Sequence, residues 1–283
     1  MKYIDKSGTI SQGHTITDHY LVNTCRVEDE NGHYHYQNVD YGGSFGSTGA
    51  KDNMQRLALE SQDNFCCYCM RDLSQPEQCV TLEHIIPQNC TEAEFNGYIE
   101  QHIAPLTSQN VMMTEKFRKI PDVQIPPRPH TVTFENIVAS CDGTFPDKRW
   151  TSQCCNNRRG QKKVFPLFYV KGIEDEISYM QDGTMQPKAT GTYSTEYRQT
   201  IENVRLNCQN LKDIRRLWHL FVDVSYDELV ACAHNEAQRV RTLRKVLFQD
   251  SRQRELDNKI LSKYTKETYW RIFLLYHWFH HKL

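Results

Sequence analysis

Six of the eleven cysteines fall into three tight groups along the chain. They are Cys66, Cys67, Cys69, Cys141, Cys154 and Cys155. Cys66 and Cys69 form a C-x-x-C knuckle, a spacing that lets two thiolates on a tight turn share one tetrahedral zinc ion. Cys141 together with Cys155, or with Cys154, could supply the other two ligands. We therefore predict a structural zinc site, because four thiolates close the coordination sphere and leave no position for water.

The remaining cysteines occur singly, at Cys25, Cys79, Cys90, Cys208 and Cys232. We expect each of them to be a buried or inert thiol and assign it no function. The chain starts without the apolar segment of a secretory signal, and no stretch approaches the roughly 20 apolar residues that cross a bilayer. These features predict a cytoplasmic protein and favour metal binding over disulfides.

A second candidate site is the pair Glu83-His84, which ends a predicted strand. A histidine has an unperturbed pKa near 6.5, so His84 could accept a proton from water at cellular pH. Glu83 should point to the opposite face of the strand and could bind a divalent metal ion. Metal-assisted hydrolysis uses both functions, because a base activates the water and a cation neutralises the negative charge that develops on the substrate.

The charge of the chain is unevenly distributed. Its net charge is only −1, yet residues 1–100 carry 6 Lys and Arg against 15 Asp and Glu, whereas residues 201–283 carry 15 against 10. A basic run between residues 147 and 163 is a candidate for binding phosphate, with a solvated helix face as the alternative. Its last four members, Arg158, Arg159, Lys162 and Lys163, are the candidates for phosphate contact.

These residues need a scaffold, and the composition allows one. With 39% hydrophobic and 11% aromatic residues, the chain of 283 residues can bury a core, which excludes the disordered, collagen-like and coiled-coil classes. We predict an α+β fold in three parts: residues 1–48, 49–170 and 171–283. Residues 1–48 should form a β-hairpin over residues 19–39, around the turn Asn31-Gly32, and then a glycine-rich linker.

The middle part should position the candidate site. We expect a helix over 51–62, a strand ending at Glu83-His84, a helix over 91–102 with Thr91 and Glu94 as its capping box, and a second strand over 130–140. A short basic helix should begin at the last cysteine pair. The final part should be largely helical beyond residue 194, with breaks near residues 225 and 250.

Four motifs together resemble a known family. They are the knuckle Cys66-x-x-Cys69, EHIIPQN at 83–89, NIVASC at 136–141 and CCNNRRG at 154–160. Over about residues 60–170 the chain resembles the zinc-bound HNH endonucleases of the ββα-metal type. The segments CCYCMRDL, VTLEHIIPQN and NVRLNCQNLKDIRRL are most similar to the PtuB-type HNH proteins of Septu-type and retron-associated anti-phage systems.

The resemblance implies a role for each motif residue. His84 would activate water and Glu83 would bind the catalytic metal, Mg²⁺ or Mn²⁺, although the family more commonly has Asp at the position of Glu83. Asn156 would help to hold that metal, with Asn157 as the alternative. Asn136 would hydrogen-bond across the loop and hold the segment that carries His84, with Asn110 as a weaker candidate for this role. The long separation of His84 from Asn136 implies an inserted helix and a proline-rich loop.

The resemblance also implies a function. The chain would be a metal-dependent HNH endonuclease that hydrolyses DNA, the effector of an anti-phage system that acts with a PtuA-like ATPase of the SMC or RecF type. RNA, such as tRNA, is an alternative substrate, and a non-catalytic zinc-supported nucleic-acid-binding module is the alternative without chemistry. The aromatic-rich tail over 269–283 could pack in a core or could dock to the partner protein.

Overall fold

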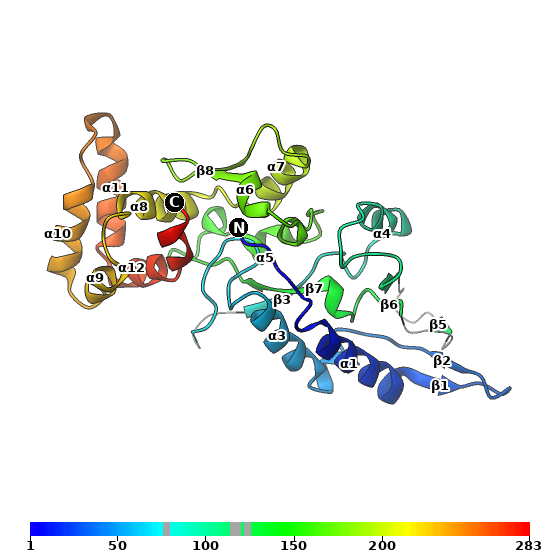
Figure 1. The fold of residues 1–283 in the computed structure, drawn as a ribbon. Coiled ribbons are helices and arrows are strands. Elements are labelled where there is room, and N and C mark those ends of the chain that lie inside the picture. The colour runs from blue at the N-terminus through cyan, green and yellow to red at the C-terminus, as the bar shows by residue number, and fades with distance from the viewer. Residues whose placement is uncertain (76–79, 114–119, 122–125) are drawn as a thin grey trace. The chain divides into compact units, whose positions relative to one another are not determined.

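The computed structural model describes residues 1–75, 80–113, 120–121 and 126–283 of the chain (Figure 1). Helices and small sheets occur together, which confirms the predicted α+β class. The residues form two compact units, each built from several stretches of the chain. The first unit is Met1–Cys67, Val80–Ser140 and Lys163–Glu174, and the second is Tyr68–Cys79, Cys141–Lys162 and Asp175–Leu283.

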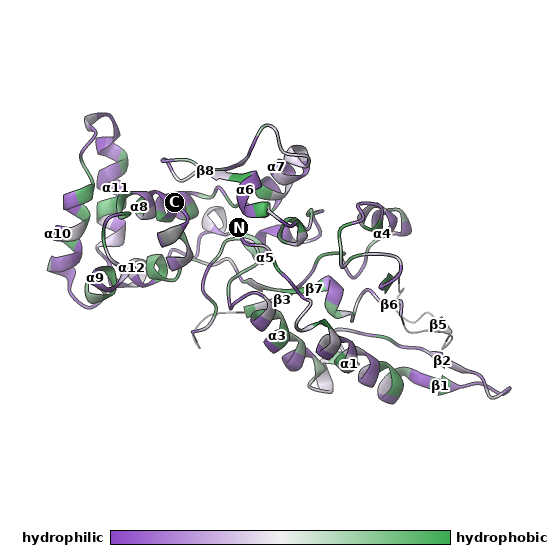
Figure 2. Cartoon of the chain, viewed as in Figure 1, coloured by the Kyte–Doolittle hydropathy of each residue, from purple (hydrophilic) through white to green (hydrophobic). Residues whose placement is uncertain are grey.

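Two helices support the first unit. The helix α1 (Ile10–Tyr20) continues in a π-helical turn, Leu21–Cys25, and packs beside α3 (Ala50–Ser61) (Figure 1). Position 13 requires glycine, because a Cβ there would lie 2.4 Å from the ring of Phe134. The prediction of a helix over 51–62 is confirmed, and α3 carries hydrophobic and hydrophilic residues on different sides (Figure 2).

The predicted hairpin over 19–39 is correct only in its second part. The strands β1 (Arg26–Glu28) and β2 (Tyr34–Tyr36) pair antiparallel around a turn with Gly32 at φ +78°, and β2 also pairs with β5 (Ile120–Pro121). Residues 19–25 are helical instead, which is a correction. Tyr20, Leu21 and Cys25 are all buried. A helix places them on one side, whereas a strand would turn Tyr20 and Leu21 to opposite faces.

The glycine-rich segment after the hairpin is not a linker, and that prediction is wrong. It contains the short helix α2 (Ser44–Ser47), and Tyr41 and Phe45 are buried. The ring of Phe45 packs edge-on against Tyr20, with ring centres 4.9 Å apart, and the Tyr20 hydroxyl bonds to Ser44 Oγ at 2.6 Å. The aromatic residues between the glycines therefore make this segment part of the core.

The predicted strand after the knuckle is confirmed as β3 (Val80–His84), which pairs with β7 (Ile137–Cys141). The second strand begins later than predicted, because Phe134–Asn136 form a 3₁₀ turn before it. The chain between these strands contains the expected helix, α4 (Glu92–Ile99), and its Thr91–Glu94 capping box is present. It also contains β4 (Val111–Met112) and β6 (Arg128–Pro129), which pair in parallel, whereas the predicted proline-rich loop lies partly outside the described residues.

The second unit contains the short helix α5 (Cys155–Arg159), as predicted, and a hairpin that was not predicted. The hairpin consists of β8 (Ile177–Tyr179) and β9 (Met185–Pro187), and it follows α6 (Ile173–Glu176) in the chain. Its turn needs a glycine at 183, where φ is +83° and a Cβ would lie 1.9 Å from the carbonyl oxygen of Lys212.

Helices dominate the rest of this unit, as expected beyond residue 194. They are α7 (Ser194–Asn203), α8 (Gln209–Leu220), α9 (Tyr226–Ala231), α10 (Glu236–Val246), α11 (Arg254–Tyr264) and α12 (Glu267–Leu274). The predicted breaks are confirmed: Ser225 caps α9 through Glu228 N, and a 3₁₀ turn begins after Asp250. No helix within the described residues is both long and apolar enough to cross a membrane.

The aromatic tail belongs to the core of the second unit. Trp270, Phe273, Tyr276 and Phe279 are each at most 2% exposed. Phe273 stacks on Trp218 with ring centres 4.4 Å apart, and the Trp270 indole donates a hydrogen bond to the Leu229 carbonyl at 3.0 Å. Of the two alternatives, these four side chains therefore pack inside the chain and offer no surface to a partner.

Candidate metal centre and catalytic site

A buried group of four thiols forms the candidate metal centre. The Sγ atoms of its members lie within 4.8 Å of one another, and the members are Cys66, Cys69, Cys141 and Cys155. The Sγ atoms of Cys69 and Cys141 are 3.6 Å apart. Zinc–sulfur bonds of about 2.3 Å in a tetrahedron place sulfurs about 3.8 Å apart, so this group could hold a metal ion such as zinc. The expected four-cysteine group is thus present.

The first half of this group depends on the end of α3. The side-chain amide of Gln62 donates to the carbonyls of Phe65 and Ala139, both at 2.8 Å, and accepts from Ala139 N at 2.7 Å. Cys67 N donates to the same Ala139 carbonyl at 3.1 Å. These bonds hold the knuckle against β7, the strand that ends in Cys141, and explain why Gln62 is buried.

The part of the group that contains Cys155 depends on close contact between the backbones of Gly143 and Cys154. Cys154 N donates to the carbonyl of Gly143 at 3.1 Å, and a Cβ at Gly143 would lie 1.8 Å from the Cys154 carbonyl oxygen. Gly143 and Cys155 both have positive φ, +79° and +50°. Position 143 therefore requires glycine, and Cys155 adopts a left-handed conformation that side chains rarely tolerate. Cys154 lies beside the group, with its Sγ 3.5 Å from that of Cys155.

One cysteine that we predicted to be isolated lies beside this group. The Cys208 thiol interacts with the Cys154 thiol, and this interaction lowers the pKa of Cys208. Cys79 lies outside the described residues, and the ten described cysteines are all free thiols. Sequence spacing could not place Cys208 here, because it is more than 50 residues from Cys154 and belongs to no knuckle.

Two buried polar residues surround the Cys69 thiol. The Tyr276 hydroxyl lies 3.7 Å from Cys69 Sγ and accepts a hydrogen bond from Arg71 Nε at 3.2 Å. Arg71 also donates to the carbonyl of Thr144 at 2.9 Å. A buried cation beside thiolates offsets part of their negative charge, and outer contacts of this kind orient metal ligands. The aromatic tail therefore reaches the cysteine group through Tyr276.

The candidate base, His84, ends β3 and has a defined tautomer. Its Nε2 lies 2.8 Å from the carbonyl oxygen of Thr131, and its Nδ1 lies 3.2 Å from the side-chain amide nitrogen of Gln88. Because a carbonyl only accepts, Nε2 carries the proton and Nδ1 keeps the lone pair. Glu83 and His84 are both buried, at 6% and 7% exposed. The pair therefore offers a carboxyl group and an imidazole whose Nδ1 accepts a hydrogen bond, and both side chains are largely buried.

Asn136 joins the segment after His84 to the start of β7. Its Oδ1 accepts from Ile86 N at 2.7 Å, and its Nδ2 donates to the carbonyls of Ile86 and His130 at 2.9 and 2.8 Å. Its own carbonyl accepts from Ile85 N at 3.0 Å. Asn110, by contrast, bonds through its amide to Pro105 within its own loop. Of the two asparagines, only Asn136 reaches the segment that follows His84.

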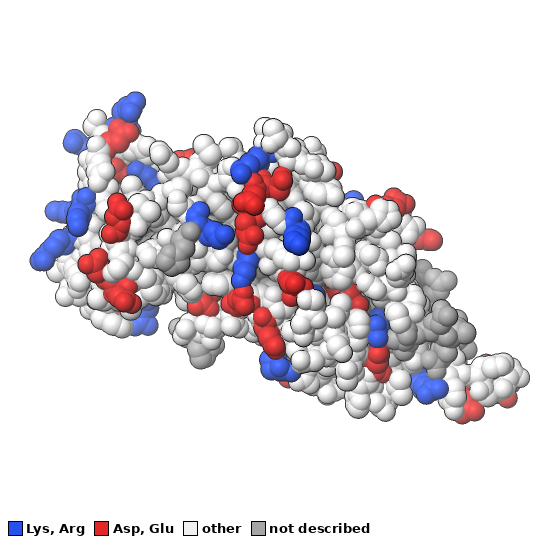
Figure 3. Space-filling view, in the orientation of Figure 1, with Lys and Arg blue, Asp and Glu red and all other residues white. Residues whose placement is uncertain are grey.

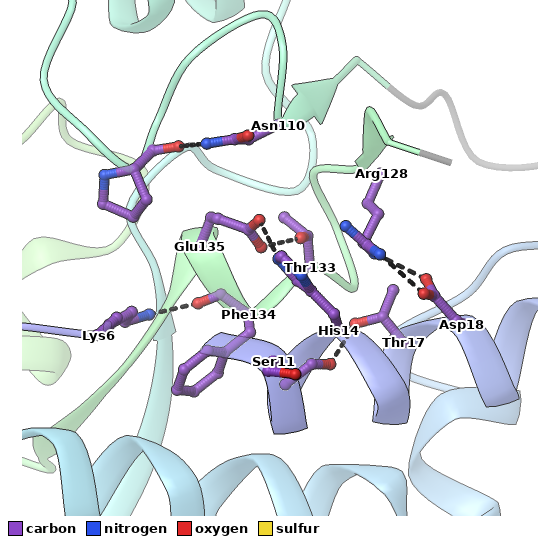
Figure 4. A network of polar contacts seen from close by, with 12 residues as sticks. Lys6, Ser11, His14, Thr17, Asp18, Asn110, Arg128, Thr133, Phe134 and Glu135 are labelled. Carbon is purple, nitrogen blue, oxygen red and sulfur yellow. Dashed lines mark hydrogen bonds and ion pairs between the residues drawn. The ribbon is translucent and has the colours of Figure 1, made fainter. Parts of the chain in front are cut away.

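The turn that carries Asn136 rests on a buried polar network (Figure 4). Glu135 accepts hydrogen bonds from His14, at 2.6 Å, and from Thr133, and the Tyr169 hydroxyl donates to the Glu135 carbonyl at 3.0 Å. The ammonium of Lys6 donates to the carbonyl of Phe134, and burial lowers the pKa of Lys6 to about 7. Residues from the N-terminal part thus hold the turn that carries Asn136, a role that no sequence motif predicted.

The remaining predicted residues lie in α5 or directly after it. Those up to Lys162 belong to the second unit, and Lys163 belongs to the first. Asn156 is half-buried and Asn157 is exposed, and neither side chain has a hydrogen bond to a described residue. Asn157 N donates to the carbonyl of Asp142 at 3.3 Å. An amide oxygen without a partner among the described residues is able to bind a metal ion, so both remain candidates.

The basic run differs from residue to residue. Arg159 is 2% exposed and donates from Nε to the carbonyl of Lys162, so it has little surface for a phosphate. Arg158 stacks on Trp150 at 3.9 Å, and that indole is 62% exposed. Lys162 and Lys163 are exposed. Elsewhere, Lys and Arg side chains gather over α10 and α11, at the left of Figure 3.

Comparison with known proteins gives no further guidance. No protein-family model matches the chain, and no curated protein is significantly similar to it.

Proposed function

We propose that this chain is a metal-dependent HNH-type endonuclease that hydrolyses phosphodiester bonds of DNA. The observation that carries the proposal is the set of hydrogen bonds between Asn136 and the segment after His84. With β3 and β7 paired beside it, this arrangement corresponds to the strand pair and bridging asparagine that the HNH resemblance implies. The buried four-cysteine group supports the same proposal as a structural zinc site.

The chemistry of the proposed site follows from His84. Because the Thr131 carbonyl holds Nε2–H, the Nδ1 lone pair is the basic position that would take the proton of the attacking water. Gln88 now lies at 3.2 Å from Nδ1, so water would replace or share this contact. Glu83 offers a carboxyl oxygen of the kind that Mg²⁺ and Mn²⁺ prefer, and a bound cation would neutralise charge on the phosphate and leaving oxygen.

On this proposal the protein is the effector of an anti-phage system and acts with an SMC- or RecF-type ATPase. The physical reason for a partner is restraint, because an uncontrolled nuclease would cut the genome of its own cell. The surface that binds the ATPase lies elsewhere than on the four buried aromatic residues of the tail.

The test is cleavage by purified protein, with and without the ATPase, on phage DNA and on total RNA in Mg²⁺ or Mn²⁺. His84→Ala should lower the rate of cleavage about 10²- to 10⁴-fold because the water loses its base, while fold and zinc content stay unchanged. His33→Ala is the matched control, since the His33 side chain is 80% exposed on the hairpin turn. Full activity of His84→Ala would eliminate the mechanism.

Two further comparisons, of substrates and of asparagine variants, test the details of the proposal. Cleavage of RNA alone would change the substrate from DNA to RNA, and binding without cleavage under every condition would favour a non-catalytic nucleic-acid-binding module. Asn156→Ala should impair cleavage more than Asn157→Ala, and the opposite order would assign the metal ligand to Asn157.

A further inference from the structure

Tyr41 packs directly against the candidate base. Its ring meets the His84 ring edge to face, with ring centres 4.4 Å apart and planes at 89°. The Tyr41 ring also stacks on the Phe45 ring, with ring centres 5.6 Å apart, and the Lys51 ammonium lies 5.2 Å from the centre of the Tyr41 ring. Tyr41 is 7% exposed. A residue from the glycine-rich segment is therefore part of the environment of His84.

The hydroxyl of Tyr41 is the unusual feature. It is fully buried and has no hydrogen-bond partner among the described residues. Burial, and then the nearby charge of Glu83, raise the pKa of Tyr41, so the hydroxyl keeps its proton at neutral pH and is available as a donor. A buried polar group without a partner lowers the stability of the fold, so its presence needs an explanation.

Other buried tyrosines of the same unit do not share this feature. The Tyr20 hydroxyl bonds to Ser44 Oγ at 2.6 Å, the Tyr98 hydroxyl accepts from Val164 N at 3.2 Å, and the Tyr169 hydroxyl donates to the Glu135 carbonyl. This unit is thus able to satisfy its buried phenols. Tyr41, whose ring touches His84, differs from these three tyrosines because its hydroxyl has no partner among the described residues.

A second residue that contacts His84 also has a buried hydroxyl without a partner among the described residues. Thr131, whose carbonyl holds His84 Nε2, has a buried Oγ1 without a hydrogen-bond partner among the described residues. An oxygen from a bound ligand would give the Tyr41 hydroxyl, beside His84, the partner that it lacks among the described residues.

We propose that the Tyr41 hydroxyl donates a hydrogen bond to an oxygen that binds beside His84. This inference rests on the proposed nuclease function and adds a residue to it. The oxygen belongs either to a water on the catalytic metal or to a non-bridging position of the phosphate. In both cases the donor favours an oxygen with negative charge, which is the charge that develops during attack of hydroxide on a phosphate. Tyr41 is then a catalytic residue in its own right.

The test compares Tyr41→Phe with wild type in the full-length, zinc-loaded protein. The substitution keeps the ring against His84 and removes only the hydroxyl. Without added Mg²⁺ or Mn²⁺, Tyr41→Phe should melt at the same temperature as wild type or higher, because an unsatisfied group has been removed. Cleavage of DNA in Mn²⁺ should fall about tenfold or more, the size expected for loss of one donor to a developing charge.

Two binding measurements identify the source of the oxygen. If it is a metal-bound water, calorimetric titration should show about 3- to 10-fold weaker Mn²⁺ binding to Tyr41→Phe. If it belongs to the phosphate, Mn²⁺ affinity should stay unchanged and the affinity for a DNA duplex, measured in the His84→Ala background, should fall instead. Tyr20→Phe is the matched control: it loses a partnered hydroxyl, so it should melt lower while both affinities are retained.

The outcomes separate this inference from the nuclease proposal. If wild type cleaves nothing but binds Mn²⁺ or DNA more tightly than Tyr41→Phe, the proposed function fails and the role of the hydroxyl in binding stands. If Tyr41→Phe equals wild type in cleavage, in Mn²⁺ affinity and in DNA affinity, the inference is overturned. A fall in melting temperature of Tyr41→Phe like that of Tyr20→Phe would also count against it, because the hydroxyl would then have a partner within the chain.

Discussion

The cysteine group and the His84 region differ in the contacts of the polar side chains beside them. Around the thiols, Gln62, Arg71 and Tyr276 all have partners, and the four sulfurs are close enough to close one coordination sphere. Around His84, the hydroxyls of Tyr41 and Thr131 are buried and have no hydrogen-bond partner among the described residues. A site that serves only the fold can use every group, whereas a site for a substrate must leave some groups open.

The two regions also respond differently to loss of one residue. The cysteine group acts as a unit, because metal affinity depends on all four ligands together and is coupled to folding. The His84 region is held by many separate hydrogen bonds around Asn136 and Glu135. We therefore expect all-or-none effects at the first region and graded effects at the second.

The largest effect should follow substitution in the cysteine group. Wild-type protein should contain about one tightly bound zinc per chain by elemental analysis, and Cys66→Ser should lose it and become insoluble, because structural zinc binding supplies folding free energy. Cys232→Ser is the matched control: Cys232 is buried but lies outside the group, with its thiol bonded to the Glu228 carbonyl. A well-folded wild type without zinc would refute the site.

An intermediate effect should follow substitution of Asn136. Asn136→Ala removes three side-chain hydrogen bonds at a fully buried position and leaves backbone groups of Ile86 and His130 unpaired. We expect the free energy of unfolding in urea to fall by about 3–5 kcal/mol, since each buried group left unpaired costs about 1–3 kcal/mol. Zinc content should be retained, in contrast to Cys66→Ser.

The control for Asn136 is Asn110→Ala. The Asn110 amide donates one side-chain hydrogen bond, to Pro105, so its loss should cost about 1 kcal/mol. Cleavage should fall strongly in Asn136→Ala even under conditions where the protein is fully folded, and should be retained in Asn110→Ala. Equal losses of activity in the two variants would remove the special role of Asn136.

The predictable parts of the molecule were those with a local signal. The C-x-x-C spacing, the capping box at Thr91 and Glu94, and the amphipathic pattern of α3 all depend on neighbours within one turn or knuckle, and each is present. Local patterns also gave the turn at Gly32 and the helical breaks near Ser225 and Asp250.

The parts that could not be predicted depend on distant contacts. Residues 19–25 became helical because Tyr20, Leu21 and Cys25 pack on one side, and the alternation of residue types gave no sign of it. Tyr41 lies in a segment whose glycines resemble a linker, and only the fold brings its ring to His84. Cys208 and Lys6 are similar cases, because their partners are far away in the sequence and no spacing connects them.

The smallest effect should come from the network under Asn136, and it should depend on pH. Burial alone would raise the pKa of Glu135, but hydrogen bonds from His14 and Thr133 outweigh it and hold the pKa below its ordinary value. A carboxyl group whose pKa is lower in the folded state stabilises the fold above the unfolded pKa of about 4.3, and this contribution disappears as the pH falls through the folded pKa. Glu135→Gln should therefore cost about 1.5–3 kcal/mol at pH 7, the range for hydrogen bonds to a charged group, and progressively less below pH 4.3.

Urea unfolding of wild type and Glu135→Gln between pH 7 and pH 3 measures the difference in their free energies of unfolding. Protonation of the thiolates at low pH releases zinc from both proteins alike, so the difference between wild type and Glu135→Gln isolates the carboxyl group. Glu60→Gln is the control, because the Glu60 side chain is 54% exposed and its ion pair with Arg56, at 3.5 Å, contributes little at any pH. If the difference in unfolding free energy between wild type and Glu135→Gln stays constant across this pH range, the charge of the Glu135 carboxylate does not stabilise the turn. The stability of the His84 region would then not depend on the ionisation of Glu135.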